Sequence, residues 1–369
     1  MIETAPGAST PATPLALLLA SSTKPHELTE YRGTLTPLEL DAPEQETAAL
    51  TELAGVHDLG WLKRVAVRGE DRFRWLSGMV TNMVSDLPEH GGAWNLVLNA
   101  QGRIQGDLTV WRHDDQLELE MAADQYERLM AHLEHFIIMD DVELVPLNGE
   151  APGMASAEAA LGLTGPLAGE LLERAGLPEL SEPMTSTRAE WYGFDLRVMR
   201  GYGVVAAHYE LRIPVAGLEK LWMFLRTAGA TPVGSARLEA FRIAEGIPAY
   251  GIDMVEKDLP QETSQMRAIS FNKGCYLGQE IVERIRSRGN VHKHLRQLEI
   301  FGPMPVRETE LTADDGTVAG QITSAAKLVK AAGSRTFAMG MIRAPFEVGE
   351  QTFHYAAGTE TGTAKIIEN

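Results

Sequence analysis

Three short segments of alternating apolar and polar residues, joined by tight turns, lie in the first third of the 369-residue chain. They cover residues 94–98, 104–110 and 117–121. Segments joined by turns this short pair antiparallel. The helix predicted after them starts at Tyr126 and repeats apolar residues at helical spacing as far as Ile137. A meander followed by an amphipathic helix predicts an α+β fold, because a doubly wound sheet needs strands that alternate with helices.

Further elements are predicted on both sides of this meander. Residues 1–14 are rich in Pro, Ala, Ser and Thr and are expected to be mobile. The remaining predictions are a strand over 64–69, a helix over 73–80, a strand over 142–145, a loop over 148–160, a helix over 165–176, a hairpin of 194–199 with 204–207, and helices over 218–225 and 236–245. From 297 to 369, short alternating segments separated by glycines predict a small all-β barrel.

The charge balance narrows the class of partner. The chain carries 33 Lys and Arg against 51 Asp and Glu, a formal net charge of −18. A field of this sign repels phosphate backbones and anionic membranes. The longest apolar runs are far shorter than the roughly 18 residues of a spanning helix. We therefore expect a cytoplasmic protein with no nucleic-acid partner and no membrane partner.

The chain has one cysteine, Cys275, which excludes an intramolecular disulfide and a four-thiolate zinc or cluster site. The motifs of phosphate-binding loops, serine hydrolases, zinc peptidases and dinucleotide-binding folds are absent. His132 and His135 are three residues apart on a predicted helix, but no third ligand accompanies them. A solvated helix face explains this pair more simply, so we expect no metal site.

The densest pattern is the run NKGCYLGQE, residues 272–280. Lys273 lies two residues before Cys275, and Gly274 and Gly278 leave room for a close approach to the backbone. A helix is predicted over 279–288, so the thiol would lie just before a helix N-terminus. An ammonium and the positive end of a helix dipole both favour a thiolate. Cys275 is therefore a candidate reactive thiol; the alternative is an inert side chain that packs as a small hydrophobe.

A basic run follows this motif in an otherwise acidic chain. Its members are Arg284, Arg286, Arg288, His292, Lys293, His294 and Arg296. One hypothesis is a solvated helix face paired with Glu280 and Glu283. The other is an anion site for a polyglutamate tail, a phosphate or an acidic partner.

Residues 273–280, KGCYLGQE, resemble the KGCYxGQE signature of the YgfZ-type folate-binding proteins. These are relatives of the glycine cleavage T protein and include a mitochondrial iron–sulfur assembly factor. Four further segments resemble T-protein motifs: 55–59 resembles GLFDV, 73–87 resembles FLQ…TND…L, 160–166 resembles ALxxxGP, and 242–251 resembles RLEAGLPLYG. The resemblance extends from about residue 45 to the end of the chain.

This resemblance implies a three-lobed α+β fold. Two α+β units of ferredoxin-like character would surround a folate site, and a C-terminal β-barrel would follow. The chain would divide into a partly disordered N-terminal extension over 1–44, a folate-binding region over 45–290 and a barrel over 291–369. The implied cofactor is tetrahydrofolate or a derivative.

Three positions can be compared with the T-protein motifs, and two of them depart from the pattern. Asp107 matches the second acid of the T-protein pair that faces folate. Ala244 stands where T proteins have the pterin-holding Glu; Glu245 is one place further, about 100° around a helix. Cys275 stands where T proteins have Asp. The last two departures argue against aminomethyl transfer and favour the YgfZ type.

The pocket also has a physical logic. A pterin is flat and aromatic with a polar edge, so it needs apolar or aromatic walls and an acid. Trp94 and Trp111 flank Asp107, and Trp111 lies four residues beyond it, on the same face of a regular strand. By resemblance both tryptophans match folate-contacting tyrosines, and Leu62 matches an apolar contact. The alternative is that both tryptophans fill the core.

We therefore interpret the chain as a tetrahydrofolate-binding protein that supports iron–sulfur cluster assembly or repair, with folate and iron–sulfur client or assembly proteins as partners. Leu62, Trp94, Asp107, Trp111 and Glu245 would hold the folate. Lys273 would neutralise a folate carboxylate or activate Cys275, the reactive or transiently ligating thiol. Two alternatives remain: a tetrahydrofolate-dependent aminomethyl- or methyltransferase, and an interaction module whose folate pocket has decayed.

Overall fold

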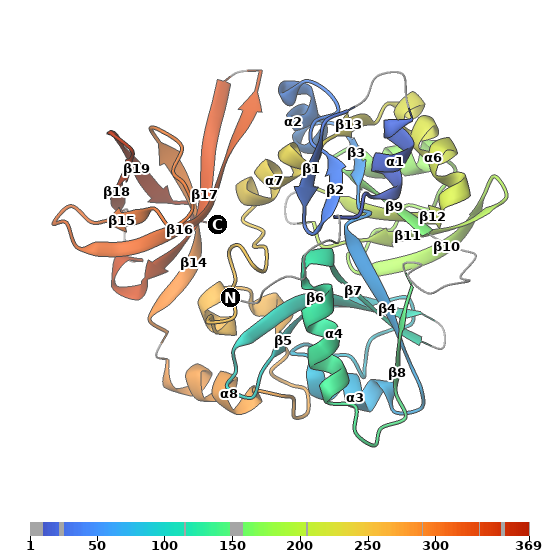
Figure 1. The fold of residues 1–369 in the computed structure, drawn as a ribbon, viewed down its shortest axis with the longest axis horizontal. Helices are drawn as coiled ribbons and strands as arrows, with labels where there is room; N and C mark the ends of the chain where they lie inside the picture. The colour runs from blue at the N-terminus through green and yellow to red at the C-terminus, as the bar shows by residue number, and fades with distance from the viewer. Residues whose placement is uncertain are drawn as a thin grey trace.

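The computed structural model describes residues 10–21, 26–113, 116–147, 158–203, 206–289, 291–331, 333–347 and 351–368, without the side chain of Arg288. A β-barrel lies at one end of the long axis, and two lobes built on separate sheets lie at the other (Figure 1). The predicted three-lobed α+β fold is confirmed. In the part of the chain that is described, no helix is both long and apolar enough to cross a bilayer.

The first lobe is the predicted antiparallel meander with one more strand on each side. Its sheet has the order β5-β6-β7-β4-β8. The bounds are β4 Leu62–Arg68, β5 Gly92–Leu98, β6 Ile104–His113, β7 Gln116–Ala122 and β8 Glu143–Pro146. Helices α3 (Arg72–Met79) and α4 (Tyr126–His135) pack on one face, where Leu76, Leu119 and Leu129 are fully buried. The opposite face of this sheet faces the second lobe, from which Arg212 donates to Glu118 and Glu120.

The second lobe has six strands in the order β10-β11-β12-β9-β3-β13. The bounds are β3 Gly55–Asp58, β9 Glu158–Thr164, β10 Thr185–Trp191, β11 Phe194–Arg200, β12 His208–Pro214 and β13 Thr231–Val233. Helices α1 (Pro14–Ala20), α5 (Ala168–Arg174) and α6 (Val215–Ala228) contribute apolar side chains to the core on one face.

Two local predictions in this lobe were wrong. The partner of β11 is not 204–207: it starts at His208, and residues 204–205 lie outside the description. Of the loop predicted over 148–160, residues 148–157 lie outside the description, whereas 158–160 belong to β9. The small residues Ala159 and Ala160 have weak strand propensity, but β9 is a central strand with partners on both sides, and that pairing overrides propensity.

The N-terminal part of the chain contributes elements that sequence analysis did not predict. A hairpin of β1 (Leu28–Tyr31) and β2 (Thr34–Pro37) precedes α2 (Pro43–Thr51). Its turn holds Gly33 at φ 86°, where an added Cβ would lie 2.6 Å from the main-chain nitrogen of Asp124. The hairpin tip is therefore pressed against the first lobe. Of the segment expected to be mobile, residues 1–9 lie outside the description.

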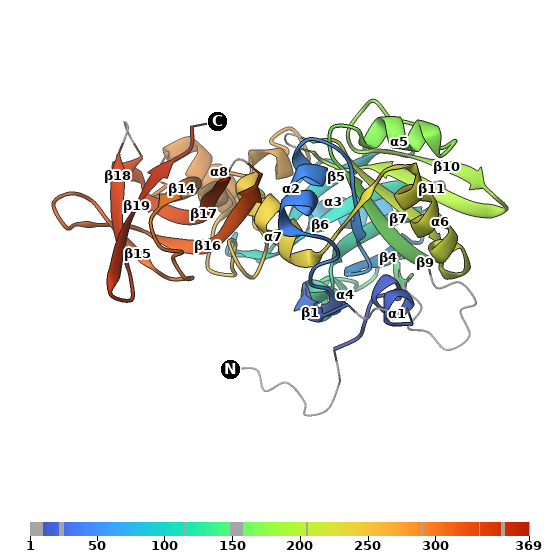
Figure 2. The ribbon, with the colours of Figure 1, turned by 90° about the horizontal axis from the view of Figure 1, so that it is seen from above.

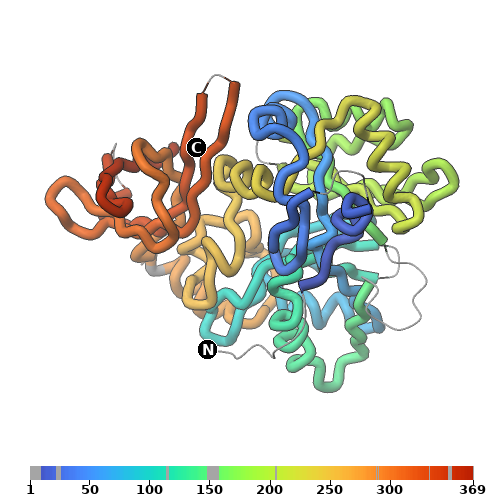
Figure 3. Tube along the Cα trace, turned by 45° about the horizontal axis from the view of Figure 1, so that its top comes forward, coloured from blue at the N-terminus to red at the C-terminus, as the bar shows by residue number. Residues whose placement is uncertain are grey.

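The barrel is closed and has the strand order β14-β17-β16-β15-β18-β19. The bounds are β14 Lys293–Phe301, β15 Glu310–Thr312, β16 Val318–Lys330, β17 Gly333–Arg343, β18 Thr352–Ala357 and β19 Glu360–Ile366. Helix α7 (Ser235–Ala244) packs between the barrel and the second lobe (Figures 2 and 3). Helix α8 (Gln279–Arg288) precedes the barrel and ends at Gly289, as predicted.

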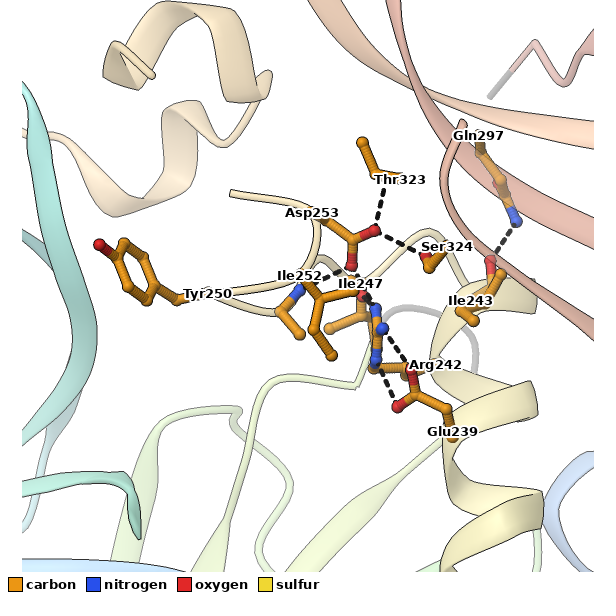
Figure 4. A network of polar contacts seen from close by, with 12 residues as sticks. Glu239, Arg242, Ile243, Ile247, Tyr250, Ile252, Asp253, Gln297, Thr323 and Ser324 are labelled. Atoms are coloured by element: carbon orange, nitrogen blue, oxygen red, sulfur yellow. Dashed lines mark hydrogen bonds and ion pairs between the residues drawn. The ribbon is translucent and has the colours of Figure 1, made fainter. Parts of the chain in front are cut away.

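A buried polar network joins α7 to the barrel (Figure 4). Nη1 of Arg242 donates to Oδ2 of Asp253 at 2.6 Å. The hydroxyls of Thr323 and Ser324, both on β16, donate to Oδ1 of the same carboxylate at 2.6 Å. One aspartate therefore fixes the segment after α7 to the barrel wall.

Candidate functional site

A cavity of about 320 Å³ lies where the two sheets, the β1–β2 hairpin and the end of α7 meet. Leu62, Trp94, Asp107 and Glu245 all line it, so the structure brings together four of the predicted site residues. Tyr31 and Arg32 of the N-terminal hairpin line it as well. The ring of Tyr31 meets that of Trp61 edge to face at 5.6 Å, and this pair forms an aromatic wall. Polar groups thus face an aromatic and apolar lining, which is typical of small-molecule sites.

Asp107 is held by two side chains. Nε1 of Trp94 donates to Oδ2 at 2.9 Å, and Nε2 of Gln125 donates to Oδ1 at 3.0 Å. Oε1 of Gln125 in turn accepts from the main-chain N–H of Asp107 at 3.0 Å. Gln125 ends the short 3₁₀ helix Ala123–Gln125 and was not predicted as a site residue. The carboxylate is therefore oriented before any ligand binds.

Glu245 follows the last residue of α7 and reaches the same cavity, whereas Ala244 does not line it. Within the described chain, the buried Oε2 of Glu245 has no hydrogen-bond partner. Burial raises the pKa of this carboxyl, and the charge of Lys330 opposes the rise. A buried acceptor without a donor is costly, so this oxygen is suited to receive an N–H group from a ligand.

Trp111 is placed differently from Trp94. It lies on the same strand as Asp107, but it is only 1% exposed and does not line the cavity. Its ring stacks on that of His113, with centroids 6.4 Å apart, and covers Gly92, where an added Cβ would lie 2.5 Å from a ring carbon. The structure therefore gives Trp111 a position in the core.

A pair of histidines, one buried and one half-buried, lines another part of the cavity. Nε2 of His57 lies 2.9 Å from Oγ1 of Thr164, and that hydroxyl lies 2.8 Å from Nδ1 of His208. The two imidazole rings stack with centroids 5.8 Å apart. Burial lowers the pKa of His57 to about 3 and that of His208 to about 4, so both rings are neutral at physiological pH. No local pattern signals this group, because its members come from β3, β9 and β12.

Two glutamates, Glu120 and Glu210, line the cavity near these histidines. The guanidinium of Arg212, which is buried between the two sheets, donates to Glu118, Glu120 and Glu210. Burial raises the pKa of Glu120, and the charge of Arg212 opposes the rise. Glu120 is therefore a carboxyl at the cavity wall that burial and the neighbouring glutamates drive toward the protonated form and Arg212 drives toward the charged form.

Lys273 and Cys275 lie outside the cavity. Nζ of Lys273 donates to the main-chain oxygens of Val80 at 2.6 Å and Asn82 at 2.7 Å. Burial lowers the pKa of this ammonium to about 8. Among the described residues, Nζ reaches neither a carboxylate nor the thiol of Cys275, which is exposed. The two members of the motif therefore face in different directions.

Of the two glycines of the motif, only Gly278 has another part of the chain packed closely against its backbone. Gly278 has φ 82°, and an added Cβ would lie 2.6 Å from the main-chain oxygen of Asn99 in the β5–β6 turn. At Gly274 an added Cβ meets nothing within 4 Å. What approaches the backbone at Gly278 is thus the chain's own hairpin turn.

The basic run after the motif is paired with acidic side chains of the chain itself. The pairs are Arg284 with Glu280, Arg286 with Glu283, Lys293 with Asp258, and His294 and Arg296 with Glu347. None of these basic residues lines the cavity. The side chain of Arg288 lies outside the description. The geometry agrees with a charge-paired surface, and the described residues hold no group of three His, Cys, Asp or Glu able to bind a metal ion.

Comparison with known proteins places this geometry in context. Residues 29–273 match the family model described as the GCVT N-terminal domain. Aminomethyltransferases from Rubrobacter xylanophilus and Desulforamulus reducens are 27% and 24% identical to the chain. The first alignment covers 80% of this chain and 78% of the relative, and the second covers 88% of each.

A solved structure resembles the whole chain. The crystal structure of the glycine cleavage system aminomethyltransferase T from Bartonella henselae matches it with a TM-score of 0.85 and 20% sequence identity. The match covers 98% of this chain and 97% of that chain. At this identity the likeness establishes the fold, including the barrel.

Proposed function

The chain belongs to the family of the GCVT N-terminal domain, and we propose from this that its central cavity binds tetrahydrofolate and that the protein transfers a one-carbon group. The observation that carries the proposal is the pair of carboxyls, Asp107 and Glu245, in one aromatic cavity. Both residues match or adjoin folate-facing positions of the T-protein motifs. The relatives reported above are aminomethyltransferases, which supports transfer as the activity.

The cavity suits a pterin in size and chemistry. Its volume of about 320 Å³ is at the lower end for ligand sites, as expected for a ring system whose tail extends outward. The unpartnered Oε2 of Glu245 can accept a hydrogen bond from the amino edge of a pterin. Trp94 and Trp61 supply aromatic walls. These features favour an intact binding site over a decayed one.

The two departures from the T-protein motifs, Ala244 and Cys275, argue less strongly against transfer once their positions in the structure are known. Ala244 replaces the pterin-holding Glu, but Glu245, the residue that follows α7, lines the cavity, whereas Ala244 does not. Cys275 replaces an Asp, but it is exposed and outside the cavity. The transferase alternative is therefore better supported than the iron–sulfur interpretation that we drew from sequence.

Each polar residue of the cavity has a distinct task in this proposal. Tetrahydrofolate supplies the nitrogen atoms that carry the one-carbon unit. Asp107, oriented by Trp94 and Gln125, accepts N–H groups at the reacting end of the cavity. Glu120, whose pKa is raised by burial at the cavity wall, is a candidate acid–base group. The edge-to-face pair of Tyr31 and Trp61 supplies an apolar wall against which a ligand ring can pack.

A second candidate function, support of iron–sulfur enzymes, is favoured by one observation. The thiol of Cys275 is exposed, so a partner protein could reach it without opening the cavity. A single thiolate cannot hold a cluster alone, so partner cysteines would supply the remaining ligands.

Binding and turnover test these proposals separately. We expect tetrahydrofolate to quench tryptophan emission, Trp94→Phe and Asp107→Asn to weaken binding, and Trp111→Phe to leave it unchanged. Transfer of the one-carbon unit from an aminomethyl-lipoyl carrier to tetrahydrofolate would support the transferase proposal. Binding without turnover, together with loss of iron–sulfur enzyme activity in a deletion strain that Cys275→Ala fails to complement, would support the second candidate. No binding at high micromolar tetrahydrofolate would refute both.

A further inference from the structure

The two histidine rings at the cavity lie on glycines that make room for them. An added Cβ at Gly162 would lie 1.9 Å from Cε1 of His57, and one at Gly201 would lie 2.6 Å from Cδ2 of His208. The rings are also stacked on each other at an interplanar angle of 11°. Packing this close leaves neither ring room to turn, so the fold fixes the direction in which each ring nitrogen points.

The hydroxyl of Thr164 couples the two rings. Oγ1 lies 2.9 Å from Nε2 of His57 and 2.8 Å from Nδ1 of His208. A hydroxyl has a single proton, so it donates to one ring and accepts from the other. When it donates to Nε2 of His57, the proton of His208 lies on Nδ1, and Nε2 of His208 carries a lone pair. The three side chains thus form one directed chain that ends at Nε2 of His208.

This Nε2 is the open end of the chain. Among the described residues it has no hydrogen-bond partner, and His208 is half-buried on the cavity wall, whereas His57 is only 3% exposed. His208 lines the cavity from β12 of the second lobe, and Asp107 lines it from β6 of the first. A ligand held by Asp107 therefore lies between that carboxylate and this imidazole.

The chain of three polar side chains is a feature of this sequence rather than of the T-protein motif. Residues 55–59, which resemble GLFDV, have His57 where the motif has Phe. Both rings are neutral, because burial lowers the pKa of each. A neutral imidazole whose second nitrogen is held by a hydrogen bond is the usual form of a general base.

We propose that His208 is an acid–base residue of the one-carbon transfer, and that Thr164 and His57 are its positioning residues. This inference rests on the proposed transferase function. During transfer, the lone pair of a folate nitrogen bonds to the one-carbon unit, and the electron pair of the broken bond stays with the leaving sulfur or nitrogen. Nε2 of His208 takes the N–H proton and returns it to the leaving atom. The protein ends unchanged, and nothing is oxidised or reduced.

The test measures transfer from an aminomethyl-lipoyl carrier to tetrahydrofolate. We expect His208→Ala to lower kcat about 100-fold with little change in the KM of tetrahydrofolate, and added imidazole to restore part of the loss. Thr164→Val keeps the shape but lacks the hydroxyl, so kcat should fall about tenfold, whereas Thr164→Ser should stay within about threefold of the wild type. His354→Ala, at an exposed position on β18, is the control on which imidazole should have no effect.

Three outcomes would overturn the role of His208 while leaving the proposed function intact. They are an unchanged kcat in His208→Ala, a loss that imidazole does not restore, and equal losses in Thr164→Val and Thr164→Ser. Thermal midpoints show which variants are folded, and the Thr164 pair decides the matter if His208→Ala is not.

Nitrogen-15 NMR of the histidine rings tests the directed chain without any turnover. We expect the wild type to carry the His208 proton on Nδ1, and Thr164→Val to show both tautomers. A wild-type ring protonated at Nε2 would overturn the proposal. A wild type without turnover is a different result, because it refutes the proposed function itself.

Discussion

The ammonium of Lys273 lies 2.7 Å from the main-chain oxygen of Asn82, the residue whose side-chain amide binds the backbones of Trp94 and Arg267. The KGCYLGQE motif is therefore connected to the cavity through one intervening residue. This relationship gives Lys273 a positioning role, because its ammonium donates to two main-chain carbonyls of the chain itself rather than to a ligand.

Replacing Lys273 with Met should loosen this turn. The substitution leaves two partly buried carbonyls without their donor, which costs about 1–3 kcal/mol of unfolding free energy. Tetrahydrofolate should also bind more weakly, because Trp94 loses its fixed position. Urea unfolding and calorimetry measure the two effects. Lys365→Met, at an exposed position, is the control, and a wild-type stability and Kd in Lys273→Met would contradict the role.

The two glycines of the motif should respond differently to alanine. Gly278→Ala places a methyl group 2.6 Å from the oxygen of Asn99 at a positive φ, so it should destabilise the protein by about 1–3 kcal/mol. Gly274→Ala meets nothing within 4 Å and should be tolerated. Thermal unfolding of the two variants compares them directly. Equal midpoints would mean that the β5–β6 turn does not need this close approach.

The exposed thiol of Cys275 should react without help from Lys273. Because Nζ of Lys273 donates to two main-chain oxygens, it is not available to the sulfur. We expect iodoacetamide to alkylate Cys275 in the native state, and Lys273→Met to change the rate by less than about twofold. Mass spectrometry of timed samples measures this. A rate that collapses in Lys273→Met would restore the activation mechanism predicted from sequence.

The buried histidine His57 should make the protein sensitive to mild acid. Its folded-state pKa of about 3 lies below the value of 6.5 expected for the unfolded chain. As pH falls below 6.5, the unfolded state binds a proton that the folded state does not, so stability decreases as pH falls toward 3. His57→Phe removes this uptake and should make the slope of unfolding free energy against pH shallower by about 1.4 kcal/mol per pH unit near pH 5.

Denaturant unfolding from pH 4.5 to 8.5 tests this prediction. The two proteins should show parallel curves above pH 7.5, where neither state takes up a proton at this position, whatever the offset caused by loss of the Thr164 contact. His208 remains in both proteins and keeps part of the acid sensitivity. Parallel curves over the whole range would show that His57 is not the source.

Asp253 should be the residue on which attachment of the barrel depends. It is 1% exposed and accepts from Arg242, Thr323 and Ser324 (Figure 4). Asp253→Ala would remove one of the two carboxylates that pair with the Arg242 guanidinium and would leave the hydroxyls of Thr323 and Ser324 without their acceptor, at a cost of about 1–3 kcal/mol. Calorimetry should show a lower midpoint, and limited proteolysis should cut between α7 and the barrel. Asp195→Ala, at an exposed position on β11, is the control; protease resistance in Asp253→Ala would contradict the prediction.

Much of the fold follows from local pattern. The meander β5–β7, helices α3, α4, α6, α7 and α8, and the barrel were all predictable, because periodicity and turn residues act between neighbours in the chain. Asp107 and Trp94 were predictable as a pair for the same reason, since they lie on one hairpin. The strand β9 and the N-terminal hairpin were not, because pairing with distant segments decides them.

The composition of the cavity was decided by the tertiary structure. His57, Thr164 and His208 are more than 100 residues apart at the extremes, and they meet because β3, β9 and β12 are neighbours in one sheet. Trp111 has the strand phase of Asp107, yet it faces a packed glycine rather than a cavity. Lys273 and Cys275 are two residues apart, yet one is buried and the other exposed. Sequence determines which side chains are available and which face of an element they share; strand order and the packing of lobes determine which of them face the same space.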